Sequence, residues 1–275
     1  MSQIIKINDF SAPELDIFVR LTGAELRRGI EQGQGILIAE STIVVDVALK
    51  SGIEPIALLT DQRLLESESV KDILKRCDGV PVYAAPTEVL RSLTGFALTR
   101  GVLCAMRRPV QSSAQSIVKN ARRIAIFDGI TDAANIGALF RSAAALGVDA
   151  VLVTSTCCDP LCRRAVRVSM GTVFQVPFTA IGETEEQWQT EGMALLRSLG
   201  FKLCAMALSD DSISISSPVL RSEEKIALVL GTEGTGLAPR TVSGCDYTVK
   251  IPMAHGVDSL NVSCAGTLAF WELCR

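Results

Sequence analysis

The second half of the chain consists of short, almost continuously apolar segments that alternate with amphipathic ones, and this pattern restricts the fold most strongly. The apolar segments are residues 124–129, 148–154, 172–178, 202–208, 226–231 and 247–252. A strand that is apolar along its whole length must be covered on both faces, as in the parallel sheets of α/β proteins. The amphipathic segments predict helices near residues 134–146, 160–168, 184–199 and 259–275. We therefore predict an α/β fold with a parallel sheet in this half.

Shorter segments of the same two kinds alternate in the first half of the chain. They predict strands at residues 35–40, 55–60, 80–85 and 101–106, and helices at 12–32, 41–50, 64–76 and after Thr87. This alternation is typical of a compact α/β sandwich. The polar segment 109–120 opens with Pro109, as linkers often do. The sequence thus predicts a smaller domain over 1–108, a linker over 109–120 and a second domain over 121–275.

The composition is that of an ordinary globular protein. Hydrophobic residues make up 48% and charged residues 21% of the chain, a balance that does not indicate disorder. No apolar run is long enough to cross a membrane, and the N-terminal residues lack a charged region that leads into a long apolar one. We therefore expect no membrane span, no secretory signal and a cytoplasmic location.

Nine cysteines are scattered along the chain, and they do not predict a metal site. Cys157, Cys158 and Cys162 lie close together but lack the paired C-x-x-C spacing of zinc sites. His255 is the single histidine, so no histidine-rich ligand set can form. We expect the cysteines to be reduced and mostly buried as small apolar residues, and no metal to be bound.

The charge of the chain gives a mixed indication for an RNA partner. The net charge is −3, whereas contacts with phosphate favour basic surfaces. Basic residues nevertheless cluster at three places: Arg107 and Arg108; Lys119, Arg122 and Arg123; and Arg163, Arg164 and Arg167. Such clusters are either solvated surface charge or a local RNA-binding surface. Because they flank the motifs described next, both interpretations stay open.

The first motif is Asn135-x-Gly137-x-x-x-Arg141, which follows the predicted strand 124–129. In the first turns of a helix, Asn135 and Arg141 would project near the carboxyl end of that strand, where ligands bind in open α/β sheets. Taken alone, the pattern fits an N-capping asparagine and a solvated arginine better.

The second motif, residues 231–237, has three glycines directly after a predicted strand. Gly231, Gly234 and Gly236 let the backbone turn sharply and leave its N–H and C=O groups free for a ligand. The order G-x-x-G-x-G is not the dinucleotide fingerprint, and no G-K-[ST] closes it as in a P-loop. Taken alone, this turn is a weak indication of a binding site.

The third motif begins with Ile251-Pro252-Met253 at the end of a predicted strand and continues with SLNVS at residues 259–263. Asp258 or Ser259 is suited to begin the last helix, as an ordinary N-cap. Asn261 would then lie in the first turn, which is unusual because asparagine is a mediocre helix former.

Together, and in this order, the three motifs resemble the signature motifs of the SpoU/TrmH branch of the SPOUT methyltransferases. A fourth stretch, residues 167–171 followed by Phe174 and Pro177, is also similar to that family, and the resemblance covers residues 122–275. The first domain resembles, more loosely, the ribosomal-protein-like RNA-binding domain that often precedes this catalytic domain.

The resemblance implies that the second domain is a deep trefoil knot whose loops bind S-adenosylmethionine. Carried over position by position, the cofactor contacts are Gly231, Ile251 and Leu260. The catalytic positions are Arg141, Asn135, Glu233, Ser259 and Asn261. The implied reaction is methylation of a ribose 2′-hydroxyl in structured RNA, with ribosomal RNA slightly favoured over transfer RNA. The implied assembly is a homodimer, with which the mean hydropathy of +0.33 is consistent.

Two positions depart from the family pattern. Ala133 stands where the family usually has proline, and Gly256 comes one residue later than the family's glycine, with His255 in its place. Neither departure removes a catalytic position. His255 could act as a base, but a loop histidine without a catalytic role is the better interpretation.

Arg141 falls on the family's central catalytic position, with Asn135 orienting it. A ribose hydroxyl is a poor nucleophile until its proton leaves, so a base or a stabilising positive group is needed. Arginine is a poor base, because the guanidinium group holds its proton firmly. Two roles stay open for Arg141: a proton acceptor coupled to an RNA phosphate, or a bidentate anchor of that phosphate beside the ribose.

Two other functions fit parts of the sequence. A nucleotide-dependent or NAD-dependent oxidoreductase is disfavoured, because no G-x-G-x-x-G follows any predicted strand. A catalytically silent RNA-binding protein of the same fold is disfavoured, because the catalytic positions of all three motifs are present.

Overall fold

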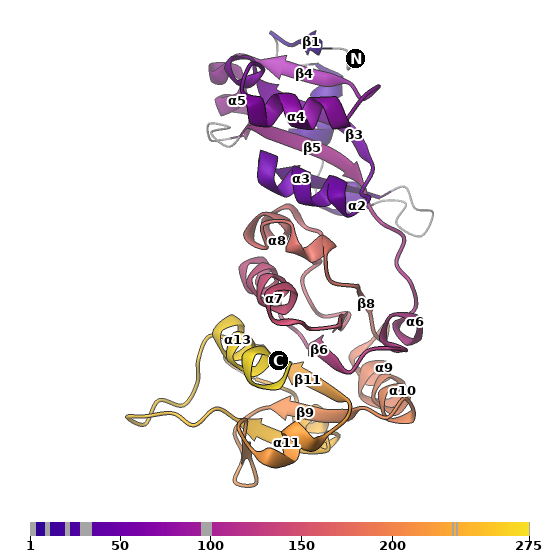
Figure 1. Cartoon of the computed structure of the whole chain (residues 1–275), viewed down its shortest axis with the longest axis vertical. Helices are drawn as coiled ribbons and strands as arrows, with labels where there is room; N and C mark the ends of the chain where they lie inside the picture. The colour runs from indigo at the N-terminus through magenta and orange to yellow at the C-terminus, as the bar shows by residue number, and fades with distance from the viewer. Residues whose placement is uncertain are drawn as a thin grey trace. The chain divides into compact units, whose positions relative to one another are not determined.

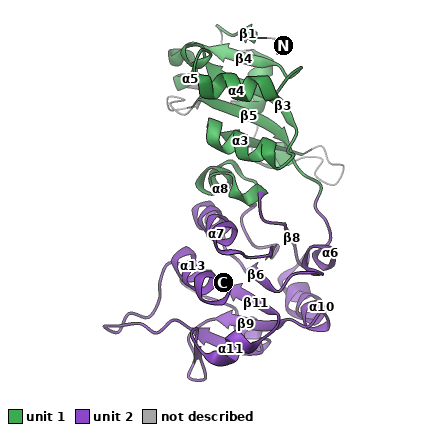
Figure 2. Ribbon diagram, viewed as in Figure 1, with its two compact units in different colours: residues 1–110, 161–174 green, residues 111–160, 175–275 purple. Residues whose placement is uncertain are grey.

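The computed structural model describes residues 4–8, 12–19, 23–27, 35–94, 101–232, 234 and 236–274. Its internal contacts divide the chain into two compact units (Figure 2). Unit 1 consists of Met1–Val110 and Leu161–Phe174, and unit 2 consists of Gln111–Pro160 and Gln175–Arg275. Each unit is built around its own sheet.

Unit 2 contains the parallel sheet that the apolar segments predict. Its strands are β6 (Arg123–Phe127), β7 (Ala150–Val153), β8 (Phe178–Ala180), β9 (Lys202–Met206), β10 (Ile213–Ser214), β11 (Ile226–Leu230) and β12 (Tyr247–Lys250). Their order is β10-β12-β9-β11-β6-β7-β8, and every pairing is parallel. Each residue of β11 is buried. The prediction of a covered parallel sheet is therefore confirmed.

Helices of unit 2 connect these strands (Figure 1). They are α6 (Ala114–Val118), α7 (Ala133–Leu146), α9 (Glu185–Gln187), the π-helical turn η5 (Trp188–Gly192), α10 (Met193–Ser198), α11 (Pro218–Ser222), α12 (Pro239–Ser243) and α13 (Val262–Leu273). The side chain of Asp132 caps α7 by accepting a hydrogen bond from the backbone N–H of Ala134, and Gly147 ends the helix in a left-handed conformation.

Helix α13 packs directly along α7. A Cβ atom on Gly266 of α13 would lie 2.4 Å from Leu139 Cδ2 of α7 and 3.0 Å from Leu230 Cδ1 of β11. Glycine therefore permits the close approach of the two helices. The hydroxyl oxygens of Ser142 and Thr267, 2.6 Å apart, form a hydrogen bond across the same contact.

Three predictions for residues 109–275 need correction. Residues 172–178 were predicted as one strand, but Thr172–Phe174 form a 3-10 turn (η4) and β8 begins only at Phe178, because Gly171 at φ +83° turns the chain first. The predicted linker 109–120 contains α6, whose apolar residue Val118 is buried in the core. The last helix begins at Val262 rather than at 258 or 259.

Unit 1 holds a mixed five-stranded sheet. Its strands are β1 (Ile4–Lys6), β2 (Ile36–Glu40), β3 (Pro55–Asp61), β4 (Val82–Ala85) and β5 (Val102–Arg107), in the order β1-β4-β3-β5-β2. Strand β5 runs antiparallel to both of its neighbours, and the other pairings are parallel. The hydroxyl of Ser41 accepts a hydrogen bond from the backbone N–H of Val44 and so caps the helix after β2, as the sequence indicates.

The helices predicted after Ser41 and after Thr87 are present in unit 1, whereas those predicted over 12–32 and 64–76 are divided into shorter ones. They are η1 (Pro13–Leu15), α1 (Asp16–Val19), α2 (Gly23–Arg27), α3 (Thr42–Lys50), η3 (Gln62–Leu64), α4 (Glu68–Arg76), α5 (Thr87–Thr94) and α8 (Arg163–Val168). The predicted helix 12–32 is replaced by three short helices within its described residues, and the rest of that prediction lies outside the described residues.

Residues 161–174 lie within the predicted second domain but pack with unit 1. The buried carboxylate of Glu40 forms ion pairs with Arg163 at 3.2 Å and Arg167 at 3.7 Å. Gly171 lies against Val47, where a Cβ atom would be 3.0 Å from the valine Cβ. The ion pairs and this close contact account for the grouping.

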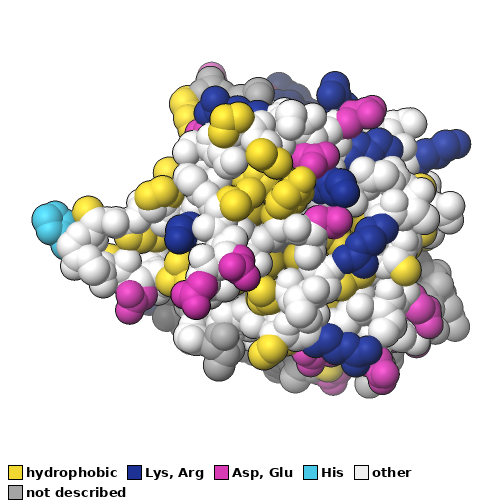
Figure 3. Space-filling model, turned by 90° about the horizontal axis from the view of Figure 1, so that it is seen from below, with side chains coloured by type: hydrophobic (Ala, Val, Ile, Leu, Met, Phe, Trp, Pro, Cys, Tyr) yellow, Lys and Arg dark blue, Asp and Glu magenta, His cyan; other side chains and the backbone are white. Residues whose placement is uncertain are grey.

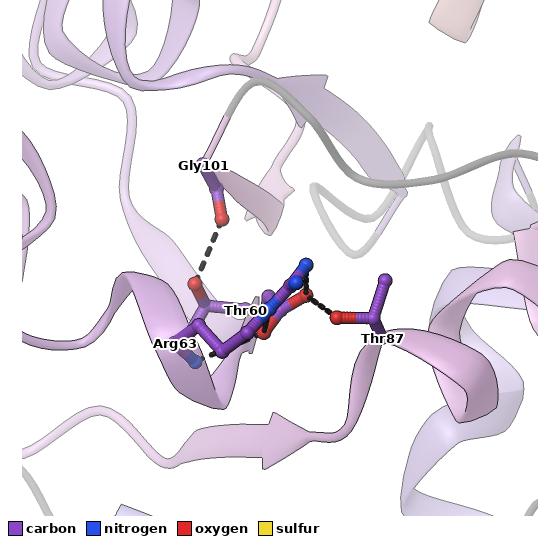
Figure 4. A network of polar contacts seen from close by, with 5 residues as sticks. Thr60, Arg63, Thr87 and Gly101 are labelled. Carbon is purple, nitrogen blue, oxygen red and sulfur yellow. Dashed lines mark hydrogen bonds and ion pairs between the residues drawn. The ribbon is translucent and has the colours of Figure 1, made fainter.

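A polar network joins the carboxyl end of β3 to the start of α5 (Figure 4). Thr60 Oγ1 donates to the carbonyl oxygen of Gly101 at 2.7 Å. The next residue, Asp61, accepts hydrogen bonds from the side chains of Arg63 and Thr87. Burial alone would raise the pKa of Asp61, but these hydrogen bonds lower it below its ordinary value.

None of the described helices has the length and apolar character that a membrane crossing needs. Within the described ranges, no three His, Cys, Asp or Glu side chains gather as metal ligands would. All nine cysteines are free thiols; three are buried, and Cys264 is exposed.

Candidate functional site

A cavity of about 1110 Å³ in unit 2 brings the second and third motifs together. Its walls are formed by residues of five segments: 206–211, 230–237, 239–245, 248–253 and 258–265. The first, second and fourth of these include the carboxyl ends of β9, β11 and β12, which are neighbours in the sheet. The carboxyl ends of parallel strands are the usual position of a ligand site in an open α/β sheet.

The glycine loop, residues 231–238, is shaped by a close backbone contact. Gly231 is buried, and a Cβ atom there would lie 2.7 Å from the backbone nitrogen of Leu237 and 2.8 Å from the carbonyl carbon of Gly236. Gly234 and Gly236 have φ values of +90° and +68°. The loop therefore needs glycine for two separate reasons, a close approach and left-handed backbone.

The three predicted cofactor contacts all line the cavity. Gly231 is buried and Ile251 is half-buried, whereas Leu260 is 38% exposed. Ser259 also lines the cavity and is exposed. Glu233, predicted as a catalytic residue, lies outside the described residues.

Asn261 connects the cavity to the first motif. Its Nδ2 atom donates to Asn135 Oδ1 at 3.1 Å. Its Oδ1 atom accepts hydrogen bonds from the backbone nitrogens of Ser263 at 2.9 Å and Cys264 at 3.4 Å. Asn261 is thus the N-cap of α13 and not part of its first turn, which removes the conflict with its low helix propensity. This interaction places the first motif beside the third.

Asn135 and Arg141 lie on α7 and are not among the residues that line the cavity. Asn135 is 6% exposed and does not cap its helix, because Asp132 has that role. Arg141 is exposed, and across the described part of the chain it makes no hydrogen bond or ion pair. Asn135 hydrogen-bonds to Asn261 and, within the same residues, not to Arg141.

Most arginines of the three basic clusters stabilise the fold. The Arg123 guanidinium donates hydrogen bonds to the carbonyl oxygens of Leu273 and Glu223. The first of these bonds gives a partner to a carbonyl at the end of α13. Arg108 is buried, and Arg107 pairs with Glu54. Arg163 and Arg167 pair with Glu40, as described above. Two cations of these clusters, Lys119 and Arg164, are exposed and make no hydrogen bond or ion pair with any described residue.

The sequence interpretation missed one wall of the cavity. Residues 206–211 follow β9 directly and line the cavity. The placement of ligand sites beyond the carboxyl ends of parallel strands could have indicated this segment. His255 is exposed at φ +57° and does not line the cavity.

Comparisons with known proteins point to one family. Residues 122–271 match the family described as the SpoU rRNA Methylase family. The chain is 42% identical over 265 residues to an uncharacterized tRNA/rRNA methyltransferase of Mycobacterium tuberculosis, covering 96% of this chain and 89% of that protein. It is 32% identical over 203 residues to the 23S rRNA (guanosine-2'-O-)-methyltransferase RlmB of Acinetobacter baylyi, covering 72% of this chain and 79% of that protein.

A solved structure shares the fold over nearly the whole chain. It is the AdoMet-bound rRNA methyltransferase from Sinorhizobium meliloti, with a TM-score of 0.81 and 21% identity, over 98% of this chain and 97% of that one. At this level of identity, the likeness concerns the fold alone.

Proposed function

Because the chain belongs to the SpoU rRNA methylase family, we propose that this RNA methyltransferase transfers a methyl group from S-adenosylmethionine to a ribose 2′-hydroxyl in structured RNA. The observation that carries the proposal is the junction of the three motifs. The second and third motifs line one cavity, and the hydrogen bond between Asn261 and Asn135 joins the helix of Arg141 to it.

The lining of the cavity fits S-adenosylmethionine. Ile251 and Leu260 offer apolar surface to an adenine ring, and the glycine loop offers backbone groups for hydrogen bonds. Ser259 and Asn261 add polar atoms on the side of α13. When bound, S-adenosylmethionine supplies an electrophilic methyl group. The AdoMet-bound relative from S. meliloti, with the same fold, supports this assignment.

Arg141 is our candidate for the group that acts at the acceptor ribose. Its guanidinium is exposed and free of partners in the described chain, so it is available to RNA. The planar guanidinium group has several N–H donors. It can form two hydrogen bonds to a phosphate while it faces the ribose hydroxyl. Asn135 and Asn261 hold the start of α7 against the start of α13, and Ser259 lines the cavity. We assign Glu233 to the same site from its position in the second motif alone.

Two finer features of the fold belong to the same proposal. We propose that unit 2 is a trefoil knot, supported by the family and by α13, which returns to pack along α7. We also propose that unit 1 binds RNA, supported by its resemblance in sequence to a ribosomal-protein-like domain. Ribosomal RNA is favoured as the substrate, because the RlmB relative acts on 23S rRNA.

We further propose a homodimer that forms through the exposed faces of α7 and α13. On α7, Arg141 is followed by the exposed small residue Ala145. On α13, Leu268 is 45% and Trp271 is 52% exposed. Figure 3, the view from below, shows that hydrophobic side chains also reach the surface elsewhere on the chain. A second copy is the favoured occupant, because exposed apolar side chains gathered on one helix are typical of symmetric dimer interfaces.

The cofactor assignment is tested by calorimetric titration with S-adenosylmethionine and with NAD. We expect binding of S-adenosylmethionine alone. Leu260→Asp should weaken this binding, because the adenine ring would displace water from the new carboxylate, at a cost of several kcal/mol. Val219→Asp places the same charge on an exposed apolar position outside the cavity and should bind as wild type does. Binding of NAD alone would favour the oxidoreductase.

The RNA target is found by mapping 2′-O-methylated riboses in cells with and without the gene. We expect one or a few positions in ribosomal RNA to lose the modification. Loss at transfer RNA positions alone would contradict the preference for ribosomal RNA, and an unchanged map would favour the silent RNA-binding protein.

A further inference from the structure

A buried carboxylate, Asp128, lies directly after β6 and joins three parts of unit 2. Its Oδ2 atom accepts hydrogen bonds from Trp188 Nε1 at 3.1 Å and from Thr241 Oγ1 at 3.3 Å. Its Oδ1 atom accepts one from Thr154 Oγ1 at 3.2 Å. Asp128 is 8% exposed, and Trp188 and Thr241 are fully buried. Water cannot easily replace these partners, so each bond is costly to lose.

Thr241 belongs to α12, which follows the glycine loop. Pro239, Val242 and Ser243 of this helix line the cavity, whereas Thr241 is its only buried residue. A helix of five residues is not stable by itself. The N-cap residue Ala238 contributes no side-chain hydrogen bond. The position of this cavity wall therefore depends on what holds Thr241.

A second hydrogen bond to Thr241 comes from the turn that contains Trp188. Gln189 Nε2 donates to Thr241 Oγ1 at 3.2 Å. Trp188 and Gln189 both belong to the π-helical turn η5, and such turns are frequent near functional sites. Neighbouring residues of one turn thus contact both Asp128 and Thr241.

The start of the glycine loop is also fitted to this end of β6. The backbone N–H of Asp128 donates to the carbonyl oxygen of Leu230 at 2.8 Å. A Cβ atom on Gly129 would lie 2.9 Å from Thr232 Cγ2. The residues on either side of Gly231 are therefore placed by Asp128 and its neighbour, while the end of the loop is placed by α12.

We propose that Asp128 and Thr241 are positioning residues, and that the hydrogen bond between them holds α12 and the glycine loop in the conformation that binds the cofactor. The inference rests on the proposed function of the cavity. Neither residue lines the cavity. Breaking the bond should therefore weaken cofactor binding without removing any group that contacts the substrate.

The test uses three variants of the full-length protein. Thr241→Val removes the hydroxyl but keeps the size of the side chain, and Thr241→Ser keeps the hydroxyl. Thr60→Val is the matched control, because Thr60 is also fully buried and its hydroxyl donates one hydrogen bond, to Gly101 in unit 1 (Figure 4). Calorimetric titration with S-adenosylmethionine measures binding, and amide hydrogen exchange in residues 240–243 measures the mobility of α12 without ligand.

We expect Thr241→Val to bind S-adenosylmethionine about tenfold more weakly, because it loses the hydrogen bonds of the hydroxyl to Asp128 and to Gln189. Its kcat at saturating cofactor should stay close to that of wild type, and exchange in α12 should be faster. Thr241→Ser and Thr60→Val should bind as wild type does. Unchanged binding by Thr241→Val, or equal weakening by Thr60→Val, would overturn this inference but leave the proposed function standing. Failure of wild type to bind S-adenosylmethionine would overturn the proposed function and the inference together.

Discussion

Arg141 is the residue on which the proposed chemistry depends most, and its two possible roles make different predictions. If it only holds an RNA phosphate, Arg141→Lys keeps the charge and should retain turnover at saturating RNA. If its planar head is needed at the reacting ribose, lysine should fail as badly as alanine, because a point charge cannot reproduce that geometry. We expect the second outcome, with kcat reduced at least about a hundredfold in both variants.

The measurement is single-turnover methyl transfer by wild-type, Lys and Ala proteins. Cofactor binding serves as the control and should be nearly unchanged, because Arg141 does not line the cavity. An Ala variant with near-normal turnover would mean that the chemistry lies elsewhere.

The sequence predicts single residues well where a motif sets them beside a strand. Gly231, Ile251 and Leu260 were predicted to share a site, and all three line one cavity. Their catalytic and binding roles stay predictions. Thr241 was not noticed, because a threonine in a short polar segment has no distinctive pattern. Asp128 was missed for a similar reason, because its three partners come from distant parts of the chain.

At the scale of helices, Asn261 combines two tasks that can be separated. Asn261→Ala removes the N-cap of α13 and should lower the free energy of unfolding by about 0.5–2 kcal/mol. Asn261→Ser retains a capping hydroxyl and should keep most of that stability. Both variants lose the amide that donates to Asn135, so both should lose turnover. Urea denaturation and methyl transfer are the two measurements, and a fully active Ser variant would show that the Asn261–Asn135 bond is dispensable.

Asp128 should make the stability of unit 2 depend on pH. Burial raises the pKa of Asp128, despite the hydrogen bonds from Trp188, Thr154 and Thr241. The folded state thus holds this proton more tightly than the unfolded state does. The stabilisation is complete below the ordinary carboxyl pKa, at roughly pH 4, and is lost as the pH rises through the raised pKa.

The reference for this effect is Asp128→Asn, which is uncharged at every pH. The difference in unfolding free energy, wild type minus variant, should fall as the pH rises from roughly 4. The lowered pKa of Asp61 acts in the opposite direction, but it is present in both proteins and cancels in the difference. Urea titrations at a series of pH values give this quantity. A difference that rises or stays constant would contradict the raised pKa.

Strands that are apolar throughout were the most predictable elements, because a continuous apolar sequence by itself predicts burial on both faces. Residues 124–129 and 226–231 were placed within about two residues of β6 and β11. Residues 172–178 are also mostly apolar, but Gly171 turns the chain before them and Pro177 interrupts them, so only Phe178 at their end belongs to β8. The two-residue strand β10 was missed, because so short a segment has no periodicity.

At the scale of the whole molecule, the proposed dimer makes a direct prediction. Light scattering at micromolar concentration should give the mass of two chains for wild type. Trp271→Glu should give monomers, because a carboxylate would lose its water within the apolar face of α13. Ile43→Glu is the control, since Ile43 is 57% exposed on α3 in unit 1 and lies outside that face. A monomeric wild type would refute the dimer, and dissociation of the control would refute the chosen face.

The division into units could be only partly foreseen from the sequence. A break near residues 109–120 was predicted, and the structural division falls at Val110. The return of residues 161–174 to unit 1 was not predicted, because it depends on Glu40, more than a hundred residues away. Patterns along the chain identify elements, but such long-range ion pairs decide which elements pack together.

The central claim, methylation of a ribose oxygen in RNA, is tested most directly by locating the transferred methyl group. Purified protein is incubated with S-adenosylmethionine labelled in its methyl group and with total RNA from cells that lack the gene, and the RNA is then hydrolysed with alkali. A methylated 2′-oxygen cannot attack the neighbouring phosphate, so the bond beside it survives. We predict that the label appears in alkali-resistant dinucleotides and that Arg141→Ala abolishes it. Label that appears only in mononucleotides, or no label above background, would contradict the claim.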